Sequence, residues 1–373
     1  MMRAAIVGTG GIAKVHARIV HELHGELVGV VGRTRASAEA FGIGAPYDDL
    51  ARMLKEQKPD VVHVCTPNYL HAEQAIEAFR AGAHVLCEKP MAVSRTEALR
   101  MIEAADKAGK IGAIAYCYRG YPLIETLRAR VAKGGFGRLR RVGGCYFSQD
   151  VFAPSKYVWH FTPGSVGPAF ALMDYGVHWF DLAEYVTGDR IAEITALFST
   201  HQEKRIWRGL PGEGPRPRGS ATSDGGVEVD VDLEDQADML IRFETGAAGS
   251  ASISAVSPGH PNNLGLVADG SEGGFDWYQQ SPNTYVERGV GGNVVHQRAP
   301  EALPAHLAWM SSVPAGHAEG YVDAFRNVVR PAWSAMRGEK AGYPTFADGL
   351  RGLILVEAAV KSARNRRPIE IAM

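Results

Sequence analysis

The sequence has few cysteines, no long apolar run and no excess of either charge. Its 373 residues include four cysteines, none in a C-x-x-C pair, so a disulfide framework or a metal site is not expected. No apolar run approaches the roughly 20 residues that span a bilayer. Lysine and arginine number 40 against 41 aspartates and glutamates. Because the two charges are nearly balanced, there is no electrostatic reason to expect nucleic acid or a membrane surface as partner.

The N-terminal residues also lack the features of a secretion signal. Met1–Val7 enters a strand pattern at once, without the longer apolar stretch and small-residue cleavage site of a signal peptide. We therefore expect a protein of the reducing cytoplasm, in which cysteine acts as a small apolar core residue. At 373 residues with 46% hydrophobic content, the chain is long enough for two domains.

The first 120 residues alternate short apolar runs with longer amphipathic stretches. The apolar runs, rich in Val and Ile, predict buried parallel strands at Ala4–Val7, Leu27–Val31, Val61–Cys65, His84–Cys87 and Ile111–Ala115. The stretches between them predict helices at Ile12–His24, Asp48–Gln57, Leu70–Ala81 and Ser94–Ala108. This alternation implies right-handed βαβ crossovers. Residues 1–120 are therefore predicted to form an α/β domain with a doubly wound parallel sheet of the Rossmann type.

The pattern of apolar and polar residues changes after about residue 135. Long, partly alternating runs predict strands at Leu139–Ser148, Ile191–Thr200, Asp235–Glu244 and Ala247–Ala255. One helix is predicted at Leu172–Val186, a surface loop or insertion at 205–226, and helices again at 316–337 and 345–364. Residues 121–373 are therefore expected to form an α+β domain on an open sheet, whose C-terminal helices can pack back on the first domain.

A glycine-rich turn follows the first strand and opens the first helix. It has the pattern G-x-G-x-x-A and consists of Gly8, Thr9, Gly10, Gly11, Ile12 and Ala13. The first glycine permits a tight turn, the second lets the backbone approach a pyrophosphate, and the alanine allows close helix packing. The helix N-terminus then faces the negative charge. The turn predicts dinucleotide binding.

The end of the second strand bears on which dinucleotide binds. NAD sites usually place an acid about 20 residues after the turn, on the ribose 2′-hydroxyl. Here the strand ends at Gly32, Arg33 and Thr34, with no acid. Arg33 can attract a 2′-phosphate and Thr34 can donate a hydrogen bond to it, which favours NADP over NAD. Alternatively, Arg33 only stacks on the adenine and either cofactor binds.

Three further segments carry polar side chains at places where an α/β enzyme binds ligands. Two follow strands, at the carboxyl edge of the sheet where such ligands lie. In the third, the two polar residues are four apart and would share one helix face. The segments contain Thr66, Pro67, Asn68 and His71; Glu88, Lys89 and Pro90; and Asp174 and His178.

These segments resemble the glucose–fructose oxidoreductase / inositol dehydrogenase / rhizopine-catabolism (Gfo/Idh/MocA) family over nearly the whole chain. Thr66–His71 is similar to the family's cofactor-lining T-P-N-x-x-H segment. Glu88-Lys89-Pro90 resembles its E-K-P motif, whose lysine lies beside the nicotinamide, and Asp174–His178 its D-x-x-x-H motif, which faces that lysine across the substrate. The resemblance implies a mostly antiparallel sheet in the second domain and often a homodimer or homotetramer formed through it.

The residue types fit oxidation of a secondary alcohol. His178 is the natural base because its ordinary pKa lies near working pH. Lys89 can hydrogen-bond the reacting oxygen and stabilise alkoxide charge. Asp174 can hold a neighbouring hydroxyl, orient His178, or merely cap its helix. Nicotinamide supplies the hydride chemistry.

The expected substrate is a sugar, sugar derivative or cyclitol such as inositol, oxidised by a dehydrogenase or reduced as a ketone. Aromatic, amide and charged groups suit a polyhydroxylated ring, and the candidate substrate residues are Tyr118, Arg119, Gln149 and Trp159. Each can equally be core or surface. Two other functions stay open: a redox-neutral enzyme that retains its cofactor, and a non-catalytic dinucleotide sensor, which would not need Lys89 and His178.

Overall fold

The computed structural model describes residues 1–162, 164–210 and 213–371. The chain divides into two compact units. The first comprises Met1–Gly120 and Gly320–Leu353, and the second comprises Tyr121–Glu319 and Ile354–Met373. The first unit therefore includes a segment from late in the chain.

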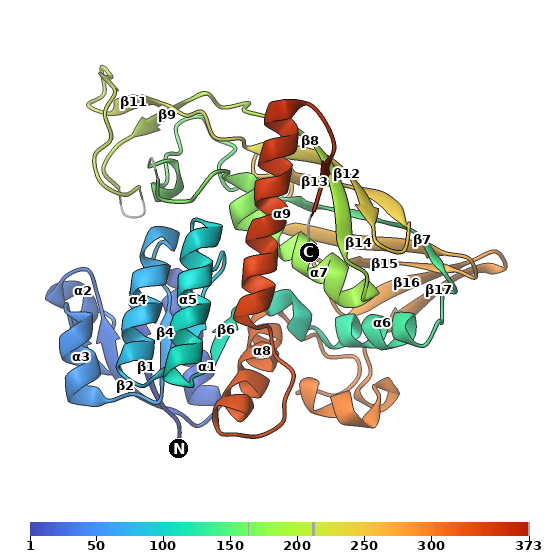
Figure 1. Ribbon diagram of the computed structural model, residues 1–373, viewed down its shortest axis with the longest axis horizontal. Helices are drawn as coiled ribbons and strands as arrows, with labels where there is room; N and C mark the ends of the chain where they lie inside the picture. The colour runs from blue at the N-terminus through green and yellow to red at the C-terminus, as the bar shows by residue number, and fades with distance from the viewer. Residues whose placement is uncertain (163, 211–212, 372–373) are drawn as a thin grey trace. The chain divides into compact units, whose positions relative to one another are not determined.

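The first unit is built on a six-stranded parallel sheet with the order β3-β2-β1-β4-β5-β6. Its strands are β1 (Arg3–Val7), β2 (Glu26–Val31), β3 (Ala45–Tyr47), β4 (Val61–Val64), β5 (His84–Cys87) and β6 (Gly112–Ile114). The helices of this part of the chain are α1 (Gly11–Glu22), α2 (Arg35–Glu39), α3 (Leu50–Gln57), α4 (Asn68–Arg80), α5 (Arg95–Ala108) and α8 (Tyr321–Met336) (Figure 1). This strand order is that of the Rossmann fold, and the predicted doubly wound sheet is confirmed.

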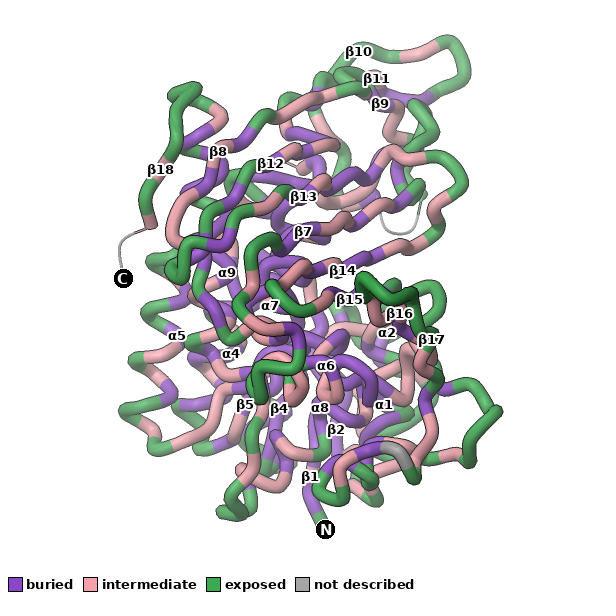
Figure 2. Tube along the Cα trace, turned by 90° about the vertical axis from the view of Figure 1, so that its right-hand side faces the viewer, coloured by how far each residue is buried: buried purple, intermediate pink, exposed green. Residues whose placement is uncertain are grey.

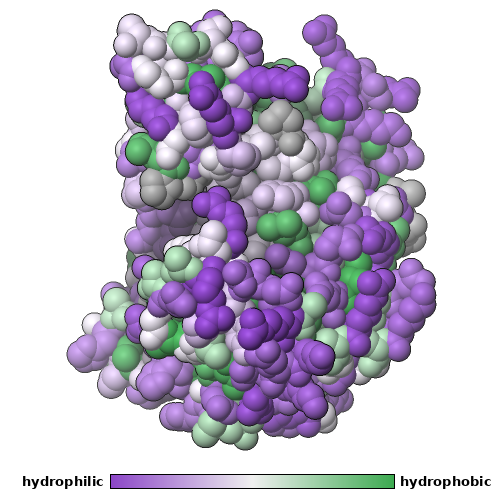
Figure 3. Space-filling view, turned by 90° about the vertical axis from the view of Figure 1, so that its left-hand side faces the viewer, coloured by the Kyte–Doolittle hydropathy of each residue, from purple (hydrophilic) through white to green (hydrophobic). Residues whose placement is uncertain are grey.

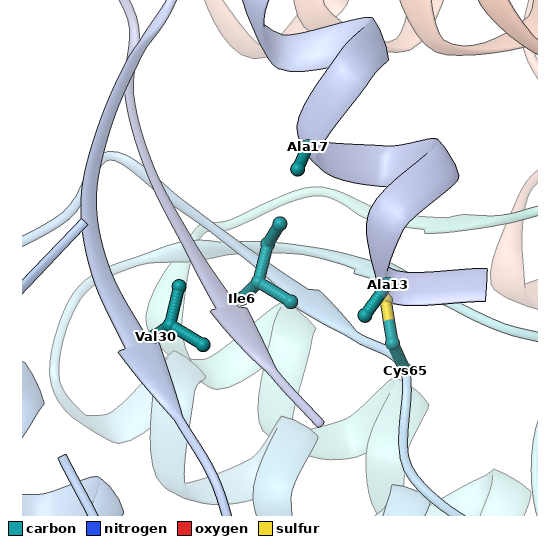
Figure 4. Close-up of a cluster of buried hydrophobic side chains, with 5 residues drawn as sticks. All are labelled: Ile6, Ala13, Ala17, Val30 and Cys65. Atoms are coloured by element: carbon teal, nitrogen blue, oxygen red, sulfur yellow. The ribbon is translucent and has the colours of Figure 1, made fainter. Parts of the chain in front are cut away.

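Small side chains bring α1 close to the sheet. Ala13 and Ala17 of α1 are buried against Ile6 of β1 and Val30 of β2, and Cys65 completes the cluster (Figure 4). Larger residues at the two alanines would push the helix away from the strands. The strands themselves are almost wholly buried (Figure 2), which explains why they read as unalternated apolar runs.

Helix α5 shows how local sequence sets the ends of these helices. The Ser94 hydroxyl accepts from the Glu97 amide at 3.2 Å, and the Glu97 carboxylate accepts from the Val93 amide at 3.2 Å. These bonds satisfy amides that the helix leaves without partners at its start. The helix ends at Gly109, whose φ of 60° closes it in the left-handed region.

The second unit is built on a nine-stranded sheet with the order β17-β16-β15-β14-β7-β13-β12-β8-β18. All neighbours are antiparallel except β7 and β13. The strands are β7 (Leu139–Phe147), β8 (Ile191–Ser199), β12 (Gln236–Phe243), β13 (Ala248–Ser254), β14 (Asn263–Gly270), β15 (Gly274–Tyr278), β16 (Thr284–Gly289), β17 (Gly292–Gln297) and β18 (Ile369–Glu370). This confirms the large, mostly antiparallel sheet that the family resemblance implies.

Sequence patterns missed β14 to β17 entirely. These strands are short, each contains or adjoins a glycine, and Asp, Glu and Asn stand among their strand-forming residues, so no long apolar run or clean alternation marks them. Pairing along the sheet decides their conformation instead. At Gly265 of β14, for example, an added Cβ would stand 2.6 Å from the Tyr278 ring of β15, so the glycine makes room for a cross-strand aromatic side chain.

Helix α7 (Val177–Thr187) packs on this sheet and also contacts α6 (Pro122–Ala132). Trp179 of α7 is fully buried, and its indole nitrogen donates to the Gly265 carbonyl at 3.1 Å. Gly144 of β7 leaves room for the same indole, since a Cβ there would lie 2.8 Å from that nitrogen. The tryptophan thus fixes α7 against β7 and β14.

Of the two alternatives predicted for 205–226, a surface loop or an insertion, the loop was wrong near both ends of the stretch, where short strands form. A small sheet has the order β10-β11-β9, with β9 at Lys204–Trp207, β10 at Ser220–Ala221 and β11 at Val227–Asp230. Backbone pairing of Val227 with Trp207 and with Ala221 gives these glycine-flanked ends partners that local composition does not reveal. Residues 211–212 of that stretch lie outside the described residues.

The two helices predicted near the C-terminus are present as α8 and α9 (Phe346–Asn365). Within the described ranges, no helix is both long and apolar enough to cross a bilayer. On the face shown in Figure 3, polar and charged side chains predominate, with hydrophobic groups in small patches between them.

Candidate active site

One row of strand ends positions the residues predicted to bind a cofactor. The parallel register aligns the last residues of five strands, Val31, Val7, Val64, Cys87 and Ile114. The residues that follow these strands are therefore neighbours along the carboxyl edge of the sheet. That edge is where α/β folds bind their ligands, beside the point at which the strand order reverses.

The glycine-rich turn leaves this edge after β1. Gly8 has φ +107°, and a Cβ on it would lie 2.5 Å from the Cys65 carbonyl oxygen, so any other residue would strain the backbone here. Gly10 precedes α1 with an extended backbone, and a Cβ there would meet nothing within 4 Å. The first turn of α1 carries no acidic residue. Its amides are thus open to an anion, which fits the pyrophosphate of a dinucleotide.

Of the other residues of the turn, some are exposed to solvent and some pack in the core. Thr9 is partly exposed and Gly11 is exposed. Ile12 packs against the buried cluster around Ala13. The turn therefore offers backbone groups to a ligand while its last two side chains fasten it to the sheet.

In the loop after β2, only a glycine fits at position 32. A Cβ at this position would lie 2.3 Å from the Ser37 hydroxyl. Thr34 caps α2 by accepting from the Ser37 amide at 3.2 Å, which leaves its hydroxyl hydrogen for another partner. Arg33 and Thr34 are both exposed. In the described parts of the chain, Arg33 has no carboxylate partner, whereas nearby Arg35 pairs with Glu39 at 3.1 Å.

His71 connects the loops after β4 and β5. Its ring is buried, with Nε2 2.8 Å from the Thr66 carbonyl oxygen and Nδ1 2.9 Å from that of Pro90. Burial lowers the pKa of His71, against these two carbonyls, which raise it. The neighbouring Asn68, in the first turn of α4, is also buried. The ring therefore lies between the T-P-N-Y-L-H segment and the E-K-P segment, and when neutral it donates to one of the two carbonyls.

The same segment is held by side-chain bonds on either side. The Thr66 hydroxyl donates to Gln74 at 2.6 Å, and Pro67 stands directly before α4. Glu88 follows β5, and its Oε2 accepts from the Lys89 amide at 3.2 Å. The backbone that carries Lys89 is thus tied to a buried carboxylate.

Tyr118 and Arg119 lie in a 3₁₀ turn at Cys117–Gly120 that follows β6. Tyr118 is buried, and the Arg119 guanidinium pairs with Asp348 of α9 at 3.1 Å. Burial by itself raises the pKa of Asp348, but Arg119 and hydrogen bonds from Thr345 bring it below its ordinary value. Sequence reasoning missed Asp348, although T-x-x-D is a capping pattern that marks the start of α9.

In the second unit, Asp174 and His178 lie where a π-helical turn joins a helix. The turn spans Leu172–Gly176 and continues into α7, in place of the single regular helix that was predicted. Asp174 lies in the turn, and its carboxylate is 3.9 Å from His160 Nε2. His178 is 6% exposed, with its ring 6.2 Å from that of Tyr146. Such π turns occur frequently at functional sites.

Glu234 anchors the start of this turn. Its buried carboxylate accepts from the Phe170 amide at 2.9 Å and from the Leu172 amide at 3.0 Å. Burial raises the pKa of Glu234 to about 7, against the two amides, which lower it. No sequence pattern pointed to this residue, because it lies more than 60 positions from the amides that it caps.

The remaining two substrate candidates lie on loops of the second unit. Trp159 opens a 3₁₀ turn at Trp159–Phe161, and its ring stacks on that of His160 at 3.8 Å. His160 in turn approaches Asp174, so the structure brings Trp159 into the surroundings of the D-x-x-x-H segment. Gln149 is exposed, and its side chain accepts from the Gly259 amide at 2.9 Å. Among the described residues, no group of three or more potential metal ligands comes together.

The first unit alone defines a class of protein. A parallel sheet in this order, with a glycine-rich turn into α1 at its carboxyl edge, is the dinucleotide-binding Rossmann domain. Residues 2–116 match the family model described as "Oxidoreductase family, NAD-binding Rossmann fold". Residues 124–276 match the model of the GFO/IDH/MocA C-terminal domain. The chain therefore belongs to the Gfo/Idh/MocA oxidoreductase family.

Individual relatives extend over the whole chain. A levoglucosan dehydrogenase from Pseudarthrobacter phenanthrenivorans is 27% identical over 342 residues, which cover 90% of this chain and 86% of the relative. An oxidoreductase domain protein from Kribbella flavida has a similar structure, with 28% identity, full coverage of both chains and a TM-score of 0.88. An inositol dehydrogenase homologue from Azotobacter vinelandii, solved with NADH and myo-inositol, has 26% identity, coverage of 99% and 97%, and a TM-score of 0.83.

Two glycines of the turn should respond differently to alanine. We expect Gly8→Ala to lower the free energy of unfolding by about 1–3 kcal/mol, because of its positive φ and its contact with the Cys65 carbonyl. Gly10→Ala should fold as the wild type does, yet bind NADH or NADPH at least about tenfold more weakly, because a methyl group would meet the pyrophosphate. Urea unfolding and fluorescence titration measure the two effects. Wild-type affinity in Gly10→Ala would show that the pyrophosphate does not approach this position.

Glu234 should make stability depend on pH. Its pKa of about 7 in the native state exceeds the ordinary value of 4.5, so the native state binds this proton more tightly than the unfolded state does. The resulting stabilisation is fully present below pH 4.5 and is lost as pH rises through 7. Relative to Glu234→Gln, the wild type should lose about 2 kcal/mol between pH 5 and pH 8.5. Parallel curves for the two proteins in urea unfolding would contradict the assignment.

Proposed function

We propose that this protein transfers hydride between a nicotinamide dinucleotide and a secondary alcohol or ketone of a sugar, sugar derivative or cyclitol. The observation that carries the proposal is that the chain has Lys89 two residues after β5, Asp174 in the π turn and His178 in the first turn of α7. The relatives support the substrate class, since they include a levoglucosan dehydrogenase and an inositol dehydrogenase homologue solved with myo-inositol.

Each of the three residues has a role that its chemistry suits. His178 accepts the proton of the substrate hydroxyl, because imidazole titrates near neutral pH. The Lys89 ammonium donates to the reacting oxygen and stabilises the negative charge that develops there. Asp174 accepts from a neighbouring hydroxyl of the ring or orients the base. When bound, the nicotinamide supplies the acceptor or donor of hydride.

The cofactor-binding role falls to residues of the carboxyl edge. Backbone amides of Gly10 and Gly11 and the start of α1 would hold the pyrophosphate. We propose a preference for NADP, supported by the exposed, unpaired Arg33 and by the hydroxyl of Thr34 among the described residues. A carboxylate at this point would repel a 2′-phosphate, and the loop after β2 carries none until Glu39.

We also propose that the protein self-associates through the nine-stranded sheet. Leu197 of β8 and Leu240 of β12 are 67% and 65% exposed. They lie on adjacent strands, since Leu240 is paired with Thr195, two residues before Leu197. Exposed leucines side by side on a sheet are costly in water, and a second copy of the sheet would cover them.

Lys89→Ala and His178→Ala should each abolish most turnover, by a factor of about 10² to 10⁴, because each removes a group that acts on the reacting oxygen. The assay is absorbance at 340 nm with NAD⁺ or NADP⁺ and a panel of aldoses, inositols and sugar acids. Cofactor affinity, followed by fluorescence, should change little. Lys107→Ala, which removes an exposed lysine paired with Glu103, is the control. Near-wild-type turnover in either test variant would remove that residue from the mechanism.

Arg33→Ala should weaken NADPH binding about 10- to 100-fold and leave NADH binding within about twofold, because a charge-assisted bond to phosphate is lost. Arg35→Ala is the matched control, since it removes a neighbouring exposed arginine that already pairs with Glu39. Calorimetric titration with each cofactor measures the difference. Equal losses for both cofactors would mean that Arg33 contacts the adenine rather than the 2′-phosphate.

A further inference from the structure

A chain of buried polar side chains crosses the first unit and ends at Glu88. It begins at Trp333 of α8, passes through His63 of β4 and His16 of α1, and reaches the carboxylate that follows β5. Both histidines are fully buried, and Trp333 and Glu88 are 1% and 7% exposed. Four polar groups this deep need defined partners, because each unpaired one would be costly.

Three short contacts connect the four side chains. The Trp333 indole nitrogen is 3.2 Å from His63 Nε2, and the two imidazoles face each other with their Nδ1 atoms 2.8 Å apart. His16 Nε2 lies 3.0 Å from Glu88 Oε1. The other oxygen of Glu88 accepts from the Lys89 amide. The chain therefore ends on the backbone of the proposed catalytic lysine.

The chemistry of the end groups fixes the direction of every hydrogen bond. An indole N–H only donates, so His63 Nε2 must be the acceptor and a neutral His63 carries its hydrogen on Nδ1. That hydrogen is donated to His16 Nδ1. His16 consequently carries its own hydrogen on Nε2 and donates it to Glu88. One tautomer of each ring satisfies all three contacts.

A proton added to either ring breaks this arrangement. Protonated His63 would turn an N–H toward the indole N–H of Trp333. Protonated His16 would force the hydrogen of His63 to the same place. Burial, followed by the nearby His16, holds the pKa of His63 well below its ordinary value, in agreement with a neutral His63.

Aromatic packing keeps the two rings in these orientations. His16 and His63 meet edge to face with centroids 5.0 Å apart, and Trp333 stands edge to face with His63 at 5.7 Å. Phe325 of α8 closes the other side of His16 at 4.8 Å. Neither ring can flip without displacing a neighbour.

Other titratable groups surround Glu88. They are His71 of α4, Cys87 of β5, Cys65 after β4, Cys117 of the 3₁₀ turn, and Lys89. Burial first, and then the negative charge of Glu88, raise the pKa of the Cys65 and Cys87 thiols. These thiols therefore stay neutral and place no second negative charge beside the carboxylate.

We propose that Trp333, His63 and His16 are positioning residues, which hold Glu88 as a fixed acceptor and thereby set the place of Lys89. The inference rests on the proposed function of Lys89, but the hydrogen-bond chain itself does not. A displacement of a catalytic group by about 1 Å can cost on the order of 10²-fold in rate. Loss of the bond from His16 should therefore act on turnover more than on binding.

The first measurement is the tautomeric state of the two rings, by ¹⁵N NMR of histidine-labelled protein with assignments from the single variants. We expect His63 to be protonated on Nδ1 and His16 on Nε2 between pH 6 and pH 8, at the ordinary histidine range. In Trp333→Phe the indole donor is gone, so His63 should titrate closer to its ordinary pKa. Any other pair of tautomers in the wild type would contradict the proposed hydrogen-bond directions from Trp333 to Glu88.

The second measurement tests its effect on the lysine. His16→Leu should lower kcat about 10- to 100-fold and leave KM and cofactor affinity within about twofold. His16→Gln, which places an amide N–H near the position of Nε2, should restore most of the loss. His84→Asn is the control, since this half-buried histidine accepts from the Ile111 amide at 3.0 Å and has no link to Glu88. Wild-type kcat in His16→Leu, or no rescue by His16→Gln, would refute the positioning role.

A third readout does not depend on turnover. In protein labelled at the lysine side chain, the Lys89 signal, assigned with Lys89→Ala, should change its shift and its titration midpoint in His16→Leu but not in His84→Asn. An unchanged Lys89 signal would refute the positioning role whatever the activity. If the wild type turned over no polyol while the tautomers and the Lys89 response were as expected, the proposed function would be wrong. The hydrogen-bond chain and its effect on Lys89 would still be supported.

Discussion

The register of the parallel sheet is the constraint on which the candidate site depends. Because the last residues of β2, β1, β4, β5 and β6 lie in one row, every loop that leaves the sheet there starts from a common edge. The glycine turn, the His71 bridge and the Glu88–Lys89 segment are all fixed from this row. A slip of one residue in any strand would turn its side chains to the opposite face and move its loop along the edge.

The two units use different buried groups to fix the segments that carry the proposed catalytic residues. In the first, a buried histidine lies between two loops, with one ring nitrogen close to a carbonyl of each. In the second, a buried carboxylate collects the amides at the start of a π turn. Both devices place charged or titratable groups away from water, where an exact partner matters most. Each fixes a short segment carrying a proposed catalytic residue, Lys89 in one unit and Asp174 with His178 in the other.

Local patterns reach only part of this arrangement. The strands at 61–64 and 84–87, the turn at Gly8–Ala13 and the three motif segments could be predicted, because apolar runs and fixed spacings encode them. Glu234, His16, His63 and Trp333 could not, because their partners lie tens to hundreds of positions away. Strands β14 to β17 were missed for a related reason, since they are short and interrupted by glycines and acidic residues, and their pairing with distant segments leaves no local pattern. Neither the fixed acceptor at Glu88 nor the π turn has a signature in adjacent residues.

The late segment of the first unit bears on the order in which the protein is made. His63 emerges from the ribosome 270 residues before Trp333, its hydrogen-bond donor. Until that tryptophan arrives, the nascent Rossmann sheet has a histidine acceptor without its partner and an edge of α1 without α8 beside it. The early chain can collapse around its strands, yet its polar interior is completed only after Trp333 has been made. Completion of the first unit is thereby coupled to translation of Tyr121–Glu319, the part of the second unit that lies between its two segments in the sequence.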